Sequence, residues 1–153
     1  MKKLSKKRII LFGVGILVVV LALGGWLLFT ILGNAAKLTE YELGAEKIRS
    51  INSVIGEERK VTGVNVGTQN GTQYKRYTYK TSSMVEDLIA YSTYLQENGW
   101  VVTQDYDLYD GNGEMKLGIE SEDYGKILVM SIKFKETQYV IRISKLIGVL
   151  PLD

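Results

Sequence analysis

The feature that most constrains this chain is a long apolar run near its N-terminus. Residues 9–33 carry no charged side chain, and 17 of these 25 residues are Leu, Ile, Val or Phe. A bilayer core about 30 Å thick is crossed by roughly 20 helical residues, so the run is long enough to span it with some tilt. We therefore predict a retained anchor in the lipid bilayer, whose residues include Ile9, Leu17, Val20, Trp26 and Leu28.

The charges beside this run predict its orientation. Residues 1–8 hold five positive charges and no acid, contributed by Lys2, Lys3, Lys6, Lys7 and Arg8. Because basic residues next to a span stay in the cytoplasm, we expect a cell-membrane protein with a cytoplasmic N-terminus and an extracytoplasmic C-terminal part. The alternative is a signal peptide that is cleaved near Ala35 and releases a secreted domain. The apolar region of a signal peptide is only about 7–15 residues long, which favours retention.

The composition of the rest of the chain narrows its chemistry. From Asn34 onward there are 14 basic and 17 acidic residues, a net charge of −3, which argues against a nucleic-acid partner. The chain contains no Cys and no His, and therefore has no disulfide, no thiolate or imidazole metal site, no Cys nucleophile and no His general base. We expect a protein that is not an enzyme and that carries no cofactor.

Residues 34–56 are predicted to be a stalk that is partly helical. Thr39 and Glu42 have the spacing of a capping box, and apolar residues follow at helical intervals. The sequence therefore predicts a short helix or turn over residues 39–51, and the alternative is an irregular stalk.

Residues 57–153 are predicted to form one α+β domain. Ser83 and Glu86 form a second capping box, and the apolar spacing after them predicts an amphipathic helix over 84–98. A six-residue loop, 67–72, is expected in the first hairpin because Asn-Gly favours a turn. The six predicted strands cover residues 59–66, 73–80, 100–108, 114–121, 126–135 and 138–146. Since short connections force antiparallel neighbours, we predict a two-layer α+β fold, one helix packed on an antiparallel sheet, in the order β-β-α-β-β-β-β.

Alternation along the last three strands predicts which side chains face the helix. The apolar alternate positions are expected to be buried: Met115, Leu117, Ile119, Leu128, Met130, Ile132, Phe134, Tyr139, Ile141 and Ile143. The intervening positions are expected to meet water: Lys116, Glu120, Ser131, Lys133, Arg142 and Ser144.

Ten tyrosines are the unusual feature of the composition. Exposed tyrosines mixed with charge favour contacts with proteins or glycans, and we predict a contact surface formed by Tyr74, Tyr77, Tyr106 and Tyr109. The alternative is that these tyrosines fill ordinary half-buried sheet positions.

Residues 105–114 superficially resemble a calcium loop. The register fails, since the sixth position is Asp110 where a glycine is needed and the twelfth is Lys116 where a glutamate is needed. Asp107 and Asp110 remain the alternative calcium ligands, against the preferred interpretation of a polar turn.

These observations together predict a single-pass membrane protein whose outer domain binds a protein or another component of the cell envelope. One alternative is a hydrolase of wall glycan that uses two carboxylates about 5–10 Å apart. The other is the secreted domain that cleavage near Ala35 would release.

Overall fold

The computed structural model describes residues 38–104 and 106–150, which belong to one compact unit, Ala35–Asp153. The predicted anchor, the basic cluster before it and the cleavage site near Ala35 lie outside the described residues. Within the two described ranges, no helix is long and apolar enough to cross a membrane.

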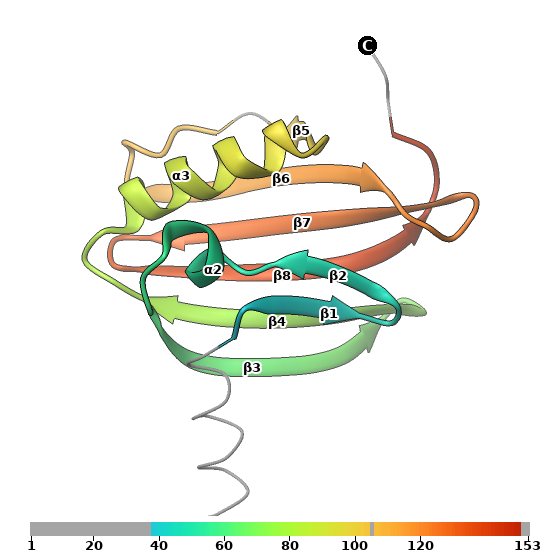
Figure 1. The fold of residues 1–153 in the computed structure, drawn as a ribbon, viewed down its shortest axis with the longest axis horizontal. Coiled ribbons are helices and arrows are strands. Elements are labelled where there is room, and N and C mark those ends of the chain that lie inside the picture. Colours follow the sequence, from blue (N-terminus) through green and yellow to red (C-terminus); the bar gives the residue numbers. More distant parts are fainter. Residues whose placement is uncertain (1–37, 105, 151–153) are drawn as a thin grey trace, which may run out of the picture. The chain divides into compact units, whose positions relative to one another are not determined.

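A six-stranded antiparallel sheet forms one layer of the domain, in the strand order β3-β4-β8-β7-β6-β5 (Figure 1). Its strands are β3 (Lys60–Gln69), β4 (Thr72–Lys80), β5 (Val101–Gln104), β6 (Asn112–Glu120), β7 (Lys126–Lys135) and β8 (Gln138–Ile147). Helix α3 (Met84–Glu97) connects β4 to β5, and β8 returns to pair with β4. The predicted two-layer α+β class is confirmed, as is the order of these seven elements.

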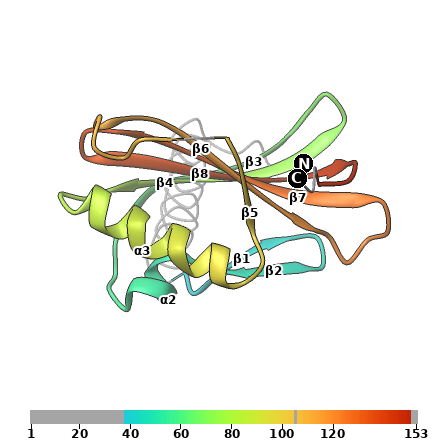
Figure 2. The same ribbon diagram turned by 90° about the horizontal axis from the view of Figure 1, so that it is seen from above.

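Among the described residues, the second layer covers one face of this sheet. Figure 2 shows α3, the short helix α2 (Ile51–Ile55) and the hairpin of β1 (Glu40–Leu43) and β2 (Glu46–Arg49) on the same side. The predicted core positions of β7 and β8 are buried beneath them, together with Leu88, Tyr91 and Leu95 of α3. We call this side the core face, and the opposite side, which carries Arg76, Ser131 and Arg142, the open face.

The helix predicted over residues 39–51 is wrong, because this segment forms the β1–β2 hairpin followed by α2. Tyr41, Leu43 and Ile48 are buried at alternating positions, as a strand requires, and Gly44 turns the chain with a φ of 64°. The N-cap is Ser50 rather than Thr39, since the Ser50 hydroxyl accepts a hydrogen bond from the Ser53 amide at 3.2 Å. Residues 40–51 therefore pack into the same core as the sheet.

Two predicted boundaries also change, and one predicted capping bond is not formed. The loop expected over 67–72 shrinks to Asn70-Gly71, whose φ values of 51° and 76° match a two-residue hairpin turn. The strand predicted over 100–108 is limited to Val101–Gln104. Ser83 makes no side-chain capping hydrogen bond, although α3 begins directly after it.

Two polar connections cross the core. The hydroxyls of Tyr41 and Tyr79 lie 2.8 Å apart and connect the β1–β2 hairpin to the sheet. The guanidinium of Arg59 pairs with the buried carboxylate of Asp87 through two bonds of 2.7 and 2.8 Å, which ties the start of β3 to α3. The polar groups on the core face are thus paired with one another.

Candidate functional site

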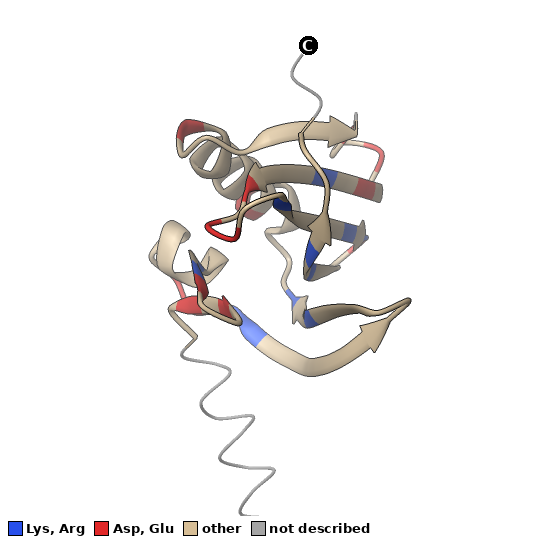
Figure 3. Ribbon diagram, turned by 90° about the vertical axis from the view of Figure 1, so that its right-hand side faces the viewer, with Lys and Arg blue, Asp and Glu red and all other residues tan. Residues whose placement is uncertain are grey.

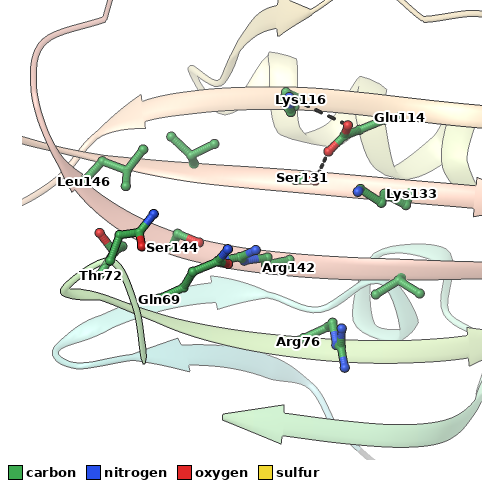
Figure 4. A pocket seen from close by; sticks show the side chains of 13 residues that line it. Gln69, Thr72, Arg76, Glu114, Lys116, Ser131, Lys133, Arg142, Ser144 and Leu146 are labelled. Atoms are coloured by element: carbon green, nitrogen blue, oxygen red, sulfur yellow. Dashed lines mark hydrogen bonds and ion pairs between the residues drawn. The ribbon is translucent and has the colours of Figure 1, made fainter. Parts of the chain in front are cut away.

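The open face contains a groove of about 630 Å³ (Figure 4). Strands β4, β8, β7 and β6 form its floor, and the tip of the β3–β4 hairpin forms one wall. The residues that line it are Gln69, Asn70, Thr72, Arg76, Glu114, Lys116, Val129, Ser131, Lys133, Val140, Arg142, Ser144 and Leu146.

Strand register aligns the polar side chains of the groove in one row. Arg76 lies directly opposite Arg142, Arg142 opposite Ser131, and Ser131 opposite Lys116. Because directly opposed residues of an antiparallel pair share a face, this row crosses four strands on the open face. Lys133 and Glu114 form the neighbouring pair.

The groove is basic in a domain that is otherwise acidic. Its lining includes four cations and a single carboxylate, whereas the chain from Asn34 onward has a net charge of −3. In Figure 3, basic residues are distributed along the strands of the sheet, and acidic residues lie mainly in the β1–β2 hairpin, in α3 and in the connections. The open face is therefore a local concentration of positive charge.

Glu114 is the single carboxylate, and its contacts keep it ionised. It accepts a hydrogen bond from the Ser131 hydroxyl at 2.6 Å and pairs with Lys116 at 3.7 Å. The Ser131 hydrogen bond, with Lys116 and Lys133 nearby, lowers the pKa of Glu114 although burial opposes the shift. Glu114 offsets part of the charge on the two lysines and leaves the arginine pair unneutralised.

Arg142 is held in place by the β3–β4 hairpin. Its guanidinium carbon lies 4.2 Å from the ring centroid of Tyr74, and its Nη2 donates a hydrogen bond to Gln69 at 2.8 Å. The Tyr74 ring in turn lies over Gly67, where an added Cβ would come within 2.8 Å of a ring carbon. The buried Nε of Arg142 has no hydrogen-bond partner among the described residues.

The arginine pair lacks a counter-charge. Among the described residues, no carboxylate lies within 4.0 Å of the charged nitrogens of Arg76, Lys133 or Arg142. Like charges directly opposite each other destabilise a sheet. The groove is therefore electrostatically unfavourable by itself and complementary to an anion.

The structure does not bring the four predicted tyrosines together. Tyr77 is a core residue with 4% exposure, so its assignment to a contact surface was wrong. Tyr106 packs against the core cluster, and Tyr109 is 82% exposed in the connection between β5 and β6. Tyr74 does not line the groove either, but its ring contacts Arg142, which does.

The residues of the groove were placed correctly but not recognised as a site. Alternation assigned Lys116, Ser131, Lys133 and Arg142 to the solvent side of the sheet, which the structure confirms. The site was missed because the sequence does not show that Arg76 lies beside Arg142. This position depends on the pairing of β4 with β8, two strands that are distant in the sequence.

The alternative calcium ligands form a polar turn. The Asp107 carboxylate accepts a hydrogen bond from the Tyr109 amide at 2.8 Å, which is the behaviour of an Asp that stabilises a turn. Within the described ranges, no group of three or more His, Cys, Asp or Glu residues could hold a metal ion.

A second groove of about 320 Å³ is lined by Glu46, Glu120 and Glu122 among other residues. Glu46 accepts hydrogen bonds from the Ser121 hydroxyl and the Glu122 amide and pairs with Lys145 at 2.9 Å. Burial raises the pKa of Glu46, but the bonds from Ser121 and Lys145 outweigh burial and lower it. Glu46 is thus an ionised structural link between β2 and the β6–β7 connection.

Comparisons of the chain with known protein families, with curated proteins and with solved structures find no match.

Proposed function

We propose that this chain is a single-pass membrane protein whose domain lies outside the cytoplasm and binds a partner from the membrane or the envelope, without catalysis, through the open-face groove. The observation that carries the proposal is the row of Arg76, Arg142 and Lys116 across the open face of the sheet. Two directly opposed arginines without a nearby carboxylate destabilise the free domain slightly, and an anionic partner would remove that cost.

The proposed anchor would allow the groove to bind its partner even with modest affinity. The uncharged run over residues 9–33 and the basic cluster before it support membrane retention with the domain outside. Confinement to a membrane raises the effective concentration of the domain toward other membrane-bound proteins. A few charged contacts would then be enough for specific association.

Glu114 and Glu46, one carboxylate from each of the two grooves, favour a role in binding over hydrolysis. A glycosidase needs one carboxylic acid whose pKa is raised, so that it can donate a proton. The pKa values of Glu114 and Glu46 are both lowered by their partners. The larger groove is moreover lined by one carboxylate, and a hydrolase needs two.

Photo-crosslinking in intact cells tests the proposal. A photoreactive residue replaces Val140, which lines the groove, and as a control replaces Thr93, which is exposed on α3. We expect position 140 to give an adduct with a membrane or envelope protein that position 93 does not give. The adduct should disappear in the R76Q/R142Q variant. Identical adducts from both positions, or no adduct from position 140, would overturn the proposal.

A further inference from the structure

We infer that the groove binds an acidic peptide segment in an extended conformation, with one carboxylate seated between Arg76 and Arg142. This inference rests on the proposed function and specifies the chemistry of the partner. It is carried by the charge, the register and the apolar floor of the groove.

The arginine pair is suited to a carboxylate. Directly opposed residues have Cβ atoms about 4.5–5.5 Å apart, a spacing at which two long side chains can contact one small anion. A guanidinium presents a planar fork of donors that matches the two oxygens of a carboxylate. Because Tyr74 and Gln69 already hold Arg142 in place, little side-chain freedom is lost on binding.

The apolar part of the lining favours a peptide over a bare polyanion. Val129, Val140 and Leu146 line the groove together with its polar side chains. A peptide covers them with aliphatic side chains, whereas a phosphate polymer leaves them without contacts. The ionised Glu114 repels a dense row of phosphates and is compatible with a peptide whose acids are spaced apart.

The length of the row sets the size of the segment. Neighbouring strands are about 4.8 Å apart, so Arg76 and Lys116, separated by three strand steps, lie roughly 14 Å apart. An extended peptide advances about 3.3 Å per residue, and four to five residues therefore cross the row.

A binding experiment on the full-length chain in a neutral detergent tests the inference. The probe is a fluorescein-labelled peptide of ten residues composed of Glu, Val and Ser, and its control replaces every Glu with Gln. Fluorescence anisotropy should show binding of the Glu peptide that is at least about tenfold tighter than that of the Gln peptide, since hydrogen bonds to charged groups are the strong ones.

The chain offers a matched control for the arginine pair. Lys60 and Lys80 are exposed, lie directly opposite each other on β3 and β4, and do not line the groove. The R76Q/R142Q variant should weaken the Glu peptide at least about tenfold, whereas K60Q/K80Q, with the same change in charge, should change its affinity less than about twofold. Thermal melting by circular dichroism checks that both variants fold, and if R76Q/R142Q does not, the single variant R76Q replaces it.

Three results would overturn the inference. The first is equal affinity for the Glu and Gln peptides, and the second is equal weakening by the arginine and lysine double variants. The third is tighter binding of inorganic polyphosphate with the same dependence on Arg76 and Arg142, which would identify a phosphate polymer as the ligand. In each case an arginine-dependent crosslink from position 140 would leave the proposed function standing, and absence of that crosslink would remove both.

Discussion

The two faces of the sheet are built from the same strands and satisfy their polar groups in opposite ways. On the core face, Tyr79 bonds to Tyr41, and the Tyr139 hydroxyl lies near the carboxylate of Asp87 that Arg59 holds. On the open face, Arg76 and Arg142 stand opposite each other without an acid among the described residues. Successive residues of one strand, such as Arg76 and Tyr77, therefore face opposite sides of the sheet and have different roles: Tyr77 packs in the core and Arg76 lines the groove.

This difference shows that the domain gains stability on the core face and loses a little on the open face. Buried polar groups are generally paired, because an unpaired one costs about 1–3 kcal/mol, whereas a typical hydrogen bond contributes about 1 kcal/mol. The charged ends of the open-face side chains are nearer to water, which screens their repulsion, although the Nε of Arg142 is buried without a partner among the described residues. A row of like charges is thus tolerated only on the open face, at a small cost that a ligand would recover.

Alkaline pH should give the largest effect, and it acts on the core face. Burial, followed by repulsion from neighbouring tyrosines, raises the pKa of Tyr41 and Tyr91, and burial likewise raises the pKa of Tyr79 and Tyr139. Their folded-state pKa values exceed the unfolded value of about 10, so their stabilising contribution is complete below pH 10 and is lost as the pH rises above it. Between its unfolded-state and folded-state pKa values, each buried tyrosine lowers the free energy of unfolding by about 1.4 kcal/mol per pH unit. We therefore expect cooperative unfolding about one to two units above pH 10.

Ultraviolet absorbance of tyrosinate and near-ultraviolet circular dichroism, recorded on the same samples, measure this transition. Ionisation of the buried tyrosines should coincide with loss of the tertiary signal. Stepwise ionisation while the tertiary signal persists would contradict the role assigned to the core face.

Loss of the ion pair between Arg59 and Asp87 should give the next largest loss of stability. Glu57, the second acid that pairs with Arg59, provides the control. Asp87 has a side chain that is 3% exposed, whereas Glu57, the second partner of Arg59, is 64% exposed. D87N should lower the free energy of unfolding by about 3 kcal/mol, because it breaks a buried pair and leaves a partly buried guanidinium with one acid. E57Q should lower it by less than about 1 kcal/mol. Urea denaturation of both variants measures the contrast, and losses of equal size would refute it.

The sequence predicted most of the sheet and failed at two kinds of position. Long strands such as β7 were predicted correctly because ten alternating residues determine both the element and its buried face. The β1–β2 hairpin was missed because its strands are four residues long, and the interval from Tyr41 to Ile48 fits a helix as well as a hairpin. Because each of these segments is so short, its local pattern does not determine the secondary structure, and tertiary packing does.

The groove escaped prediction for a different reason. Its charge depends on the pairing of β4 with β8, which the chain closes only after α3 and three further strands. Alternation placed Arg142 on the solvent side, but no local pattern specifies which residue stands opposite it. Tyr77 was misassigned although the alternate positions of β4, Arg76 and Thr78 on one side and Tyr77 and Tyr79 on the other, already separated the two faces.

The smallest effect has the opposite sign to the others and tests the open face directly. R76Q removes one of two directly opposed cations and should raise the free energy of unfolding by about 0.2–1 kcal/mol. The exposed Lys47 is the matched control, since it pairs with Glu40 at 3.8 Å and Glu42 at 3.7 Å, and K47Q should therefore lower stability slightly, by less than about 1 kcal/mol. Urea denaturation at low ionic strength measures both, and added salt should shrink the two differences toward zero. If R76Q instead destabilised the domain as much as D87N does, Arg76 would belong to the structural framework, and the distinction between a paired core face and an unneutralised open face would fail.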